Sequence, residues 1–284
     1  MNTQKHTILI LGASGFIGNA IYKEVCSYFE THGTYYLQKE QFIENQVFHY
    51  YDTAKGGIAE ILKAVNPSVI ISSHKGDQRS TFQEHKVICE YIKAHHNSRL
   101  LFISTAQVFD GMFEYPSYEN DTPKSATALG VFKIKMERLL LTEIPAQLAI
   151  IRLPLVLGNT SPIITLLRKS AEFATSFEVY PNKIISVNTI NKITQQIHYI
   201  INKNLDGIFH LASEDVIHHH DLMMEICNRY NGKFPIFKNA YSRNDDSYNA
   251  ILPKFNKLPE PYTITVAQVV DNCILEDIIT LRNN

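Results

Sequence analysis

The feature that most constrains this chain is an apolar run near the N-terminus that breaks into three evenly spaced glycines. Residues 7–18 read Thr-Ile-Leu-Ile-Leu-Gly-Ala-Ser-Gly-Phe-Ile-Gly. A short, continuous apolar run is typical of a strand buried in a parallel sheet, and the glycines indicate a turn into a helix over residues 16–29. The chain is therefore expected to open with a strand, a glycine-rich turn and a helix.

Each glycine has its own expected role in such a turn. Gly12 permits the tight bend, Gly15 lets backbone approach a pyrophosphate, and Gly18 lets the helix pack against the strand. The pyrophosphate would lie on the free N–H groups at the helix N-terminus, beside Phe16 and Ile17. The pattern predicts dinucleotide binding, and the alternative is a turn with a purely structural role.

Composition and charge argue against several classes of partner. The chain has 284 residues, and 27 lysines and arginines against 28 aspartates and glutamates leave a formal charge of −1. This balance favours neither nucleic acid nor an anionic membrane surface. No apolar run reaches the roughly 18 residues of a spanning helix, and the first strand begins too early for a secretory signal, so we expect a cytoplasmic protein.

The cysteines and histidines show no metal-binding pattern, so no metal site is expected. The cysteines have neither metal nor redox spacing and mostly fall in apolar helical patterns, which predicts reduced, buried thiols at Cys26, Cys89, Cys227 and Cys273. Three consecutive histidines, residues 218–220, would diverge around a helix and cannot converge on one ion, so a solvated helix start is expected. His95 and His96 are expected at an exposed helix end.

Strands and helices alternate through the first half of the chain. The apolar runs predict strands over 34–38, 47–51, 68–72 and 100–104, with helices over 57–65 and 81–96. This alternation predicts an α/β fold, a Rossmann-type doubly wound parallel sheet. Ligands of such sheets bind at the carboxyl ends of strands, so Ser72 and Ser73 are expected to line the cofactor cleft or to satisfy the strand end.

The end of the second predicted strand bears on cofactor choice. A fold specific for NAD usually places an acid there to hold the ribose 2′-OH, whereas this chain reads Leu-Gln-Lys-Glu at residues 37–40. Lys39 could face a 2′-phosphate, which favours NADP, with NAD as the alternative cofactor. The competing interpretation of Lys39 is a solvated loop lysine.

The second half has a different character. Strands are expected over 148–153 and 207–212, helices over 163–174, 189–202, 218–230 and from 266, and a proline- and tyrosine-rich stretch over 234–262. Loop-rich segments after a sheet commonly build a substrate lobe. We expect residues 1–160 to form mainly the NAD(P)-binding Rossmann domain, and residues 161–284 to complete the sheet and form a small substrate-binding lobe.

Later segments carry a family resemblance. The fifth strand continues as Ile-Ser-Thr-Ala-Gln-Val-Phe-Asp-Gly over residues 103–111, and Tyr-Glu-Asn-Asp-Thr-Pro follows at 118–123. With the three spaced glycines, these segments make the chain resemble the extended short-chain dehydrogenase/reductases. It looks most like the dTDP-4-dehydrorhamnose reductases, whose corresponding run is Ser-Thr-Asp-Tyr-Val-Phe-Asp-Gly. Segments 151–153 and 207–211 also match in order, so the resemblance covers nearly the whole chain.

The resemblance implies a mechanism and its residues. In that family NADPH delivers a hydride to the ketone of a sugar nucleotide and a tyrosine donates a proton, while a lysine four residues later holds the nicotinamide ribose. It implies that Lys133 is this lysine, that Thr105 orients the carbonyl and that Asp52 contacts adenine. The competing interpretations are an exposed helix lysine, a turn-capping hydroxyl and a turn aspartate.

The tyrosine position is occupied by Leu129, which has no proton to donate, and Ala106 and Gln107 also depart from the family run. General acid catalysis typically contributes roughly 10²- to 10⁴-fold, so we expect a poor ketone reductase unless another group takes over. Tyr115 and Tyr118, in the preceding loop, are the candidates, although a loop phenol would have to be held with hydrogen-bond precision.

Two functions therefore compete. One is an NADP-dependent reductase that acts on a nucleotide-linked sugar or related small molecule through an altered acid. The other is a catalytically silent dinucleotide-binding protein with a regulatory or assembly role. The regulatory β subunit of methionine adenosyltransferase is similar to these reductases, so the fold can serve such a role, although no motif here matches that subunit specifically. A homodimer is compatible with either function.

Overall fold

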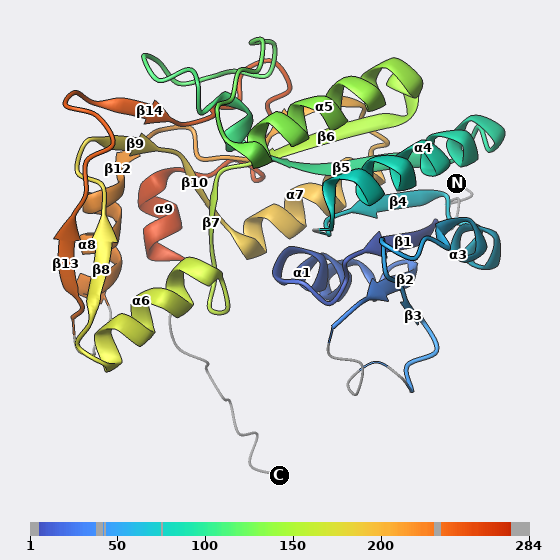
Figure 1. Cartoon of the computed structure of the whole chain (residues 1–284), viewed down its shortest axis with the longest axis horizontal. Coiled ribbons are helices and arrows are strands. Elements are labelled where there is room, and N and C mark those ends of the chain that lie inside the picture. Colours follow the sequence, from blue (N-terminus) through green and yellow to red (C-terminus); the bar gives the residue numbers. More distant parts are fainter. Residues whose placement is uncertain (1–5, 38–41, 43, 75, 230–233, 274–284) are drawn as a thin grey trace.

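The computed structural model describes residues 6–37, 42, 44–74, 76–229 and 234–273. Its centre is a seven-stranded sheet in the order β11-β6-β5-β4-β1-β2-β3, with every neighbouring pair parallel (Figure 1). The strands are β1 (Thr7–Leu11), β2 (Glu30–Tyr35), β3 (Phe48–Tyr50), β4 (Val69–Ser72), β5 (Arg99–Thr105), β6 (Leu148–Leu153) and β11 (Gly207–His210). The predicted Rossmann-type, doubly wound α/β fold is confirmed.

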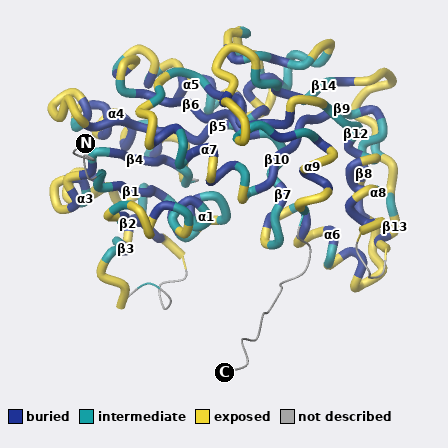
Figure 2. Tube along the Cα trace, turned by 180° about the vertical axis from the view of Figure 1, so that it is seen from behind, coloured by how far each residue is buried: buried dark blue, intermediate teal, exposed yellow. Residues whose placement is uncertain are grey.

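Both faces of the sheet are covered by helices, because successive strand residues point to opposite sides. Ile8 and Ile10 of β1 pack toward α1 (Phe16–Val25) and α7 (Ile190–Asn202). Leu9 and Leu11 pack instead toward the helices on the other face, which are α3 (Ile58–Val65), α4 (Gln78–Ala94) and α5 (Ala128–Glu143). Figure 2 shows the buried strands between helices whose outer surfaces are exposed.

A second apolar cluster lies beyond the carboxyl ends of the strands and forms a smaller lobe. Its helices are α6 (Pro162–Glu172), α8 (His219–Arg229) and α9 (Val266–Asp271). Short strands surround them: β7 (Leu155–Leu157), β8 (Ser176–Val179), β9 (Lys183–Ile185), β10 (Val187–Thr189), β12 (Ile217–His218), β13 (Ile236–Asn239) and β14 (Ser247–Asn249). Two 3₁₀ turns, η1 (Ala106–Phe109) and η2 (Pro145–Gln147), precede α5 and β6.

The predicted boundaries between the first helix and the second strand are wrong by four residues. α1 ends at Val25, where the N–H groups of Tyr28 and Phe29 both donate to the Val25 carbonyl and close a turn. β2 then begins at Glu30, because Glu30 pairs with Thr7 of β1. Cross-strand pairing therefore decides the start of β2, and the local β-type pattern at 34–38 captured only its end.

Two expectations for histidines and cysteines need correction. The helix start at 218–220 is not fully solvated, because the His219 side chain is buried against Tyr180 and burial lowers its pKa to about 4. Cys89 and Cys227 are buried as predicted, whereas Cys26 is exposed and Cys273 is half-buried. His95 and His96 are exposed after α4, as predicted. Among the described helices, none is long and apolar enough to cross a membrane.

Candidate functional site

A cleft with a volume of about 690 Å³ opens at the carboxyl ends of β1, β2 and β4. Its size is within the roughly 300–1,000 Å³ that is usual for small-molecule sites. Its walls come from the glycine-rich loop, the segments after β2 and β3, and the loop between β4 and α4. Of the predicted cofactor-binding residues, the cleft is lined by Gly12, Gly15, Phe16, Ile17, Asp52 and Ser73.

Two of the three loop glycines leave no space for a side chain. Gly12 has φ +82°, and a Cβ there would lie 2.6 Å from the Cβ of His74. A Cβ on Gly18 would lie only 2.2 Å from the Gly12 carbonyl oxygen. A Cβ on Gly15 would meet nothing closer than that same oxygen at 3.4 Å, so Gly15 is open toward the cleft. The geometry matches the bend and the close helix packing that the spacing predicts.

The loop brings the N-terminus of α1 to the cleft. Gly15 is the N-cap, and within the described structure neither a side-chain cap nor an acidic residue occupies the first turn. The first N–H groups and the helix dipole therefore favour an anion at this point. Gly12 N–H donates to Thr34 Oγ1 (2.9 Å), which fixes the loop against β2. This turn of Gly12, Gly15 and Gly18, the glycine cradle, fits the diphosphate of a dinucleotide.

The end of β2 carries aromatic and aliphatic side chains where an NAD-specific fold usually has an acid. β2 ends at Tyr35, and Tyr35, Tyr36 and Leu37 all line the cleft. No carboxylate among these residues is available for the 2′-OH contact that is typical of NAD sites. Lys39, the predicted contact for a 2′-phosphate, lies outside the described residues.

The residues after β3 and β4 divide between the cleft and the interior. Asp52 lines the cleft, and its Oδ1 also accepts a hydrogen bond from Ala54 N–H (3.0 Å), so it shapes the turn as well. Ser73 lines the cleft and donates to the Leu11 carbonyl (2.9 Å). Ser72 is not among the residues that line the cleft, which agrees with the alternative interpretation of a polar group satisfied at the strand end. It is buried with its hydroxyl 2.9 Å from His85 Nε2, because neighbouring strand residues face opposite sides.

Beneath the cleft lies a buried cluster that the sequence analysis missed. Tyr51 O–H donates to Glu84 Oε2 (2.8 Å), and His74 Nε2 lies 3.3 Å from the same oxygen. Burial by itself would raise the pKa of Glu84, but the close approach and charge of His74, together with His85 and Tyr51, lower it overall. The sequence signal was weak: two polar residues, Glu84 and His85, within the buried stripe of α4.

The two predicted catalytic residues do not line this cleft. Thr105 ends β5, and its Oγ1 accepts from Gln107 N–H (3.3 Å), so it caps η1 as the competing interpretation proposed. Lys133, on α5, donates from Nζ to the Ile103 carbonyl (2.8 Å), and the Nζ lies 4.4 Å from the centre of the Phe102 ring. Its role in holding a ribose stays a prediction.

Neither candidate tyrosine, Tyr115 or Tyr118, has a described contact with Leu129 or Lys133. Leu129 lies in the first turn of α5 with 40% of its surface exposed. Tyr115 is 75% exposed in its loop. The ring of Tyr118 lies 4.8 Å from Lys254 Nζ, and its backbone N–H donates to Asp121 (2.7 Å).

A buried ion pair connects the sheet to the segments that close over it. Arg152 of β6 donates from two nitrogens to the Glu137 carboxylate of α5, at 3.2 and 2.8 Å, and both side chains are almost fully buried. Arg152 also donates to the Glu119 carbonyl (3.2 Å) and contacts His210 Nε2 (3.3 Å). Burial, followed by the charge of Arg152, lowers the pKa of His210 to about 3.

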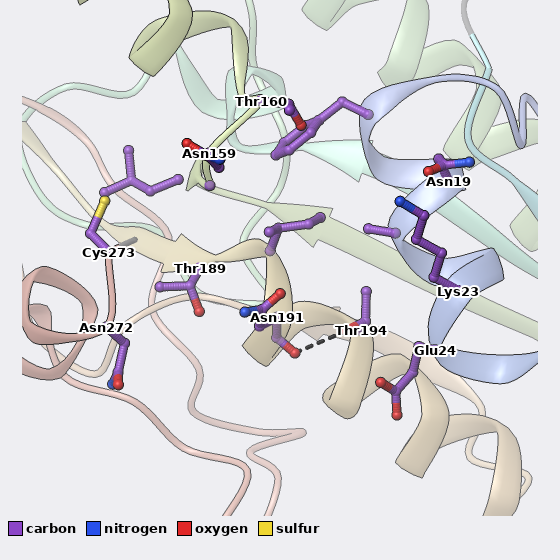
Figure 3. Close-up of a pocket in the computed structure, with 15 residues that line it drawn as sticks. Asn19, Lys23, Glu24, Asn159, Thr160, Thr189, Asn191, Thr194, Asn272 and Cys273 are labelled. Carbon is purple, nitrogen blue, oxygen red and sulfur yellow. Dashed lines mark hydrogen bonds between the residues drawn. The ribbon is translucent and has the colours of Figure 1, made fainter. Parts of the chain in front are cut away.

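A second cavity of about 380 Å³ lies between α1, the β7–α6 connection and α7 (Figure 3). Both polar and apolar groups line it, with Asn19 and Lys23 on one side and Asn191 and Thr194 on the other (Figure 3). Phe16 lines both cavities. None of the residues predicted for catalysis lines this second cavity.

Comparison with known protein sequences matches one family model and one curated relative. A family model described as the RmlD substrate-binding domain matches residues 77–250. The methionine adenosyltransferase 2 subunit beta of Danio rerio is 25% identical over 256 residues, an alignment that covers 81% of this chain and 75% of that protein.

Solved structures with similar folds share little sequence. The dTDP-4-dehydrorhamnose reductase of Bacillus anthracis str. Ames in complex with NADP matches with a TM-score of 0.75 at 14% identity, covering 96% of this chain and 99% of that chain. A hypothetical dTDP-4-dehydrorhamnose reductase from Sulfolobus tokodaii gives 0.73 at 19% identity, covering 86% and 91%. The Bordetella bronchiseptica enzyme WbmG in complex with NAD gives 0.76 at 13%, covering 95% and 94%. At these identities the likeness shows the fold.

Proposed function

Because the chain belongs to the RmlD substrate-binding domain family, we propose that it binds NADP(H), with NAD(H) as the alternative, and does not reduce ketones through a tyrosine on α5. The observation that carries the binding proposal is the glycine cradle. Gly12 and Gly18 are closed to any side chain, and Gly15 faces a cleft of suitable size.

The residues that line the cleft after β2 support NADP(H) as the first choice of cofactor. Tyr36 and Leu37, the two described residues directly after β2, line the cleft and carry no carboxylate to hold a ribose 2′-OH. The similar reductase from Bacillus anthracis was solved with NADP, and the similar Bordetella enzyme with NAD. Gly15, Phe16 and Ile17 would hold the diphosphate, and Asp52 would contact the adenine end.

Loss of the acid supports a silent protein. When NADPH is bound, it supplies a hydride, but a ketone also needs a proton on its forming alkoxide. Leu129 cannot supply that proton, Tyr115 is 75% exposed in its loop, and the Tyr118 ring lies against Lys254. The similarity to a protein named as a subunit of methionine adenosyltransferase supports a role as a partner subunit that binds a dinucleotide.

A second candidate is reduction of a nucleotide-linked sugar by a different proton donor. It is favoured by the retention of Thr105 at the end of β5 and Lys133 on α5, and by the match of a substrate-binding family model over residues 77–250. In this function Lys133 would have to leave the Ile103 carbonyl to reach a ribose, and Thr105 would orient the substrate carbonyl.

The test combines binding with a restored phenol. Calorimetry with NADPH and NADH establishes whether the cleft binds either cofactor, and cofactor oxidation is then followed with a panel of 4-keto nucleotide sugars. We expect NADPH binding, no turnover by the wild type, and turnover by Leu129→Tyr. Leu129→Phe is the matched control, because it adds the same ring without the hydroxyl and should remain inactive.

Each result distinguishes the two functions. Turnover by Leu129→Tyr alone means a reductase silenced at one position. Turnover by the wild type at a rate comparable to that of Leu129→Tyr rejects the silent function and supports the second candidate. Absence of NADPH and NADH binding rejects the dinucleotide-binding function altogether.

A further inference from the structure

The wall of the cleft contains a buried negative charge. The Glu84 side chain is 1% exposed; burial alone would raise its pKa, but His74, His85 and Tyr51 lower it overall. A buried carboxylate is costly unless a cation or several donors compensate it. Tyr51 supplies one neutral donor to Oε2, whereas Oε1 has no hydrogen-bond partner among the described residues and lies 3.5 Å from His85 Nδ1.

His85 does not supply the compensating charge. Its Nδ1 lies 2.8 Å from the Thr81 carbonyl, which can only accept, so Nδ1 carries the hydrogen and Nε2 accepts from the Ser72 hydroxyl. Burial also lowers the pKa of His85 to about 4. His85 is therefore neutral near pH 7.

His74 is the remaining basic group in described contact with Glu84. Its Nε2 lies 3.3 Å from Glu84 Oε2, and its side chain is 11% exposed. Both ring nitrogens of His74 are buried, and neither has a hydrogen-bond partner in the described part of the chain, so the approach of Nε2 to Glu84 is an ion-pair distance. The backbone and Cβ of His74 pack on Gly12, and His74 itself lines the cleft. The imidazole thus lies between the buried carboxylate and the place where an anionic nucleotide would bind.

We propose that His74, oriented by Glu84, is a nucleotide-binding residue that takes up a proton when an anionic nucleotide enters the cleft. This inference rests on the proposed dinucleotide binding. With a neutral His74 the wall has the charge of Glu84, which repels a diphosphate, whereas an imidazolium cancels that charge. By linkage, a ligand that prefers the protonated form draws protons into the site, and its affinity falls as pH rises.

Other ionisable groups surround the ring. Asp52 and Asp77 line the same cleft, and hydrogen bonds from Ser80 lower the pKa of Asp77. Tyr51, which follows β3, donates to Glu84, and the charge of Lys133 on α5 contributes to lowering the pKa of His85. Lys75 follows in the sequence and lies outside the described residues. Because all of these remain unchanged in single variants of His74, those variants isolate its contribution.

The experiment measures proton uptake during NADPH binding. Calorimetry at pH 6, 7 and 8 in buffers of different ionisation enthalpy gives affinity and protons bound together. The 2′-phosphate of NADPH also titrates near pH 6. The difference between the wild type and His74→Gln cancels this common contribution. We expect His74→Gln to bind about tenfold more weakly at pH 6 and to lose the extra proton uptake and the fall in affinity toward pH 8.

A second variant separates electrostatics from simple support. Glu84→Gln removes the charge that both stabilises the imidazolium and repels the ligand, so it should lose proton uptake at pH 7 without a matching loss of affinity. A purely structural role of the pair predicts that both variants weaken binding alike at every pH. His95→Gln, at the exposed end of the same helix, is the control and should behave like the wild type.

If His74→Gln fails to fold, the inference can still be tested on the wild type alone. Calorimetry then measures proton uptake, and NMR follows the ring protons of His74 with and without NADPH. A shift of the His74 titration to higher pH on binding supports the proposal. NADPH binding with an unchanged His74 titration, or equal proton uptake in wild type and His74→Gln, overturns it and leaves the proposed function intact. Failure of the wild type to bind any dinucleotide removes both.

Discussion

Gly18 offers a direct test of the glycine cradle. Alanine at this position would place a Cβ 2.2 Å from the Gly12 carbonyl oxygen and 2.8 Å from the Gly12 carbonyl carbon. The obstacle is backbone, and the loop is held by hydrogen bonds from Gly12 N–H to Thr34 Oγ1 (2.9 Å) and from Gly15 N–H to the Gly12 carbonyl (3.0 Å). The loop or the helix must therefore move.

The cost follows from overpacking. Extra methyl groups in well-packed sites typically cost about 1–3 kcal/mol, and a backbone obstacle favours the upper end. Alanine regains about 1 kcal/mol through its helix propensity, so Gly18→Ala should lower the free energy of unfolding by about 2 kcal/mol. For a chain of this length the expected fall in Tm is about 3 °C.

The assay pairs thermal unfolding with NADPH binding and uses Gly15→Ala as the control. At Gly15 the new Cβ would meet only the Gly12 carbonyl oxygen at 3.4 Å, so the fold should be nearly unaffected. Because Gly15 lines the cleft, its methyl group should weaken NADPH binding by about tenfold or more. A Gly18→Ala variant that melts within about 1 °C of the wild type and binds NADPH normally would show that the close contact with Gly12 does not constrain the loop.

Three further outcomes are expected. Burial lowers the pKa of His85, His210 and His219 to about 4, 3 and 4. Their neutral forms therefore stabilise the fold fully above the unfolded pKa, about 6.5, and this stability is lost as pH falls toward 4. Denaturant unfolding at pH 4.5 should give a free energy of unfolding lower than at neutral pH by on the order of 2 kcal/mol per histidine. Glu137→Gln should cost about 3 kcal/mol, because it leaves the buried Arg152 guanidinium without its counter-charge, and equal unfolding midpoints would contradict this. If the cleft recognises mainly the adenosine half, 2′-phospho-ADP-ribose should compete for NADPH binding within about threefold of NADP⁺ itself; a tenfold or larger gap would indicate a substantial nicotinamide contribution.

Much of the fold could be predicted from local patterns. The apolar runs at 7–11 and 100–104 are strands because both faces of a parallel sheet are covered, and such strands are apolar at nearly every position. Boundaries were less accurate. β2 begins at Glu30 only because it pairs with Thr7, and α4 begins at Gln78 because the Asp77 carboxylate accepts a hydrogen bond from Ser80 N–H (2.8 Å).

The site was predictable where it lies in one segment. The glycine spacing carries the geometry of its own turn, so Gly12 and Gly18 have the expected tight contacts. Ser72 was left between two interpretations because a strand end does not reveal which of two adjacent side chains faces the ligand. The direction of Ser72 depends on the twist and packing of β4 against α4.

Residues close together in the chain encode the class of the fold, the glycine cradle and the lack of a tyrosine at position 129. The meeting of distant groups depends on how the elements pack. Tyr51, His74 and Glu84 come from three separate segments and share one buried charge beneath the cleft. No periodicity encodes that meeting, since it arises from the parallel order of the strands, which brings their carboxyl ends to one edge of the sheet.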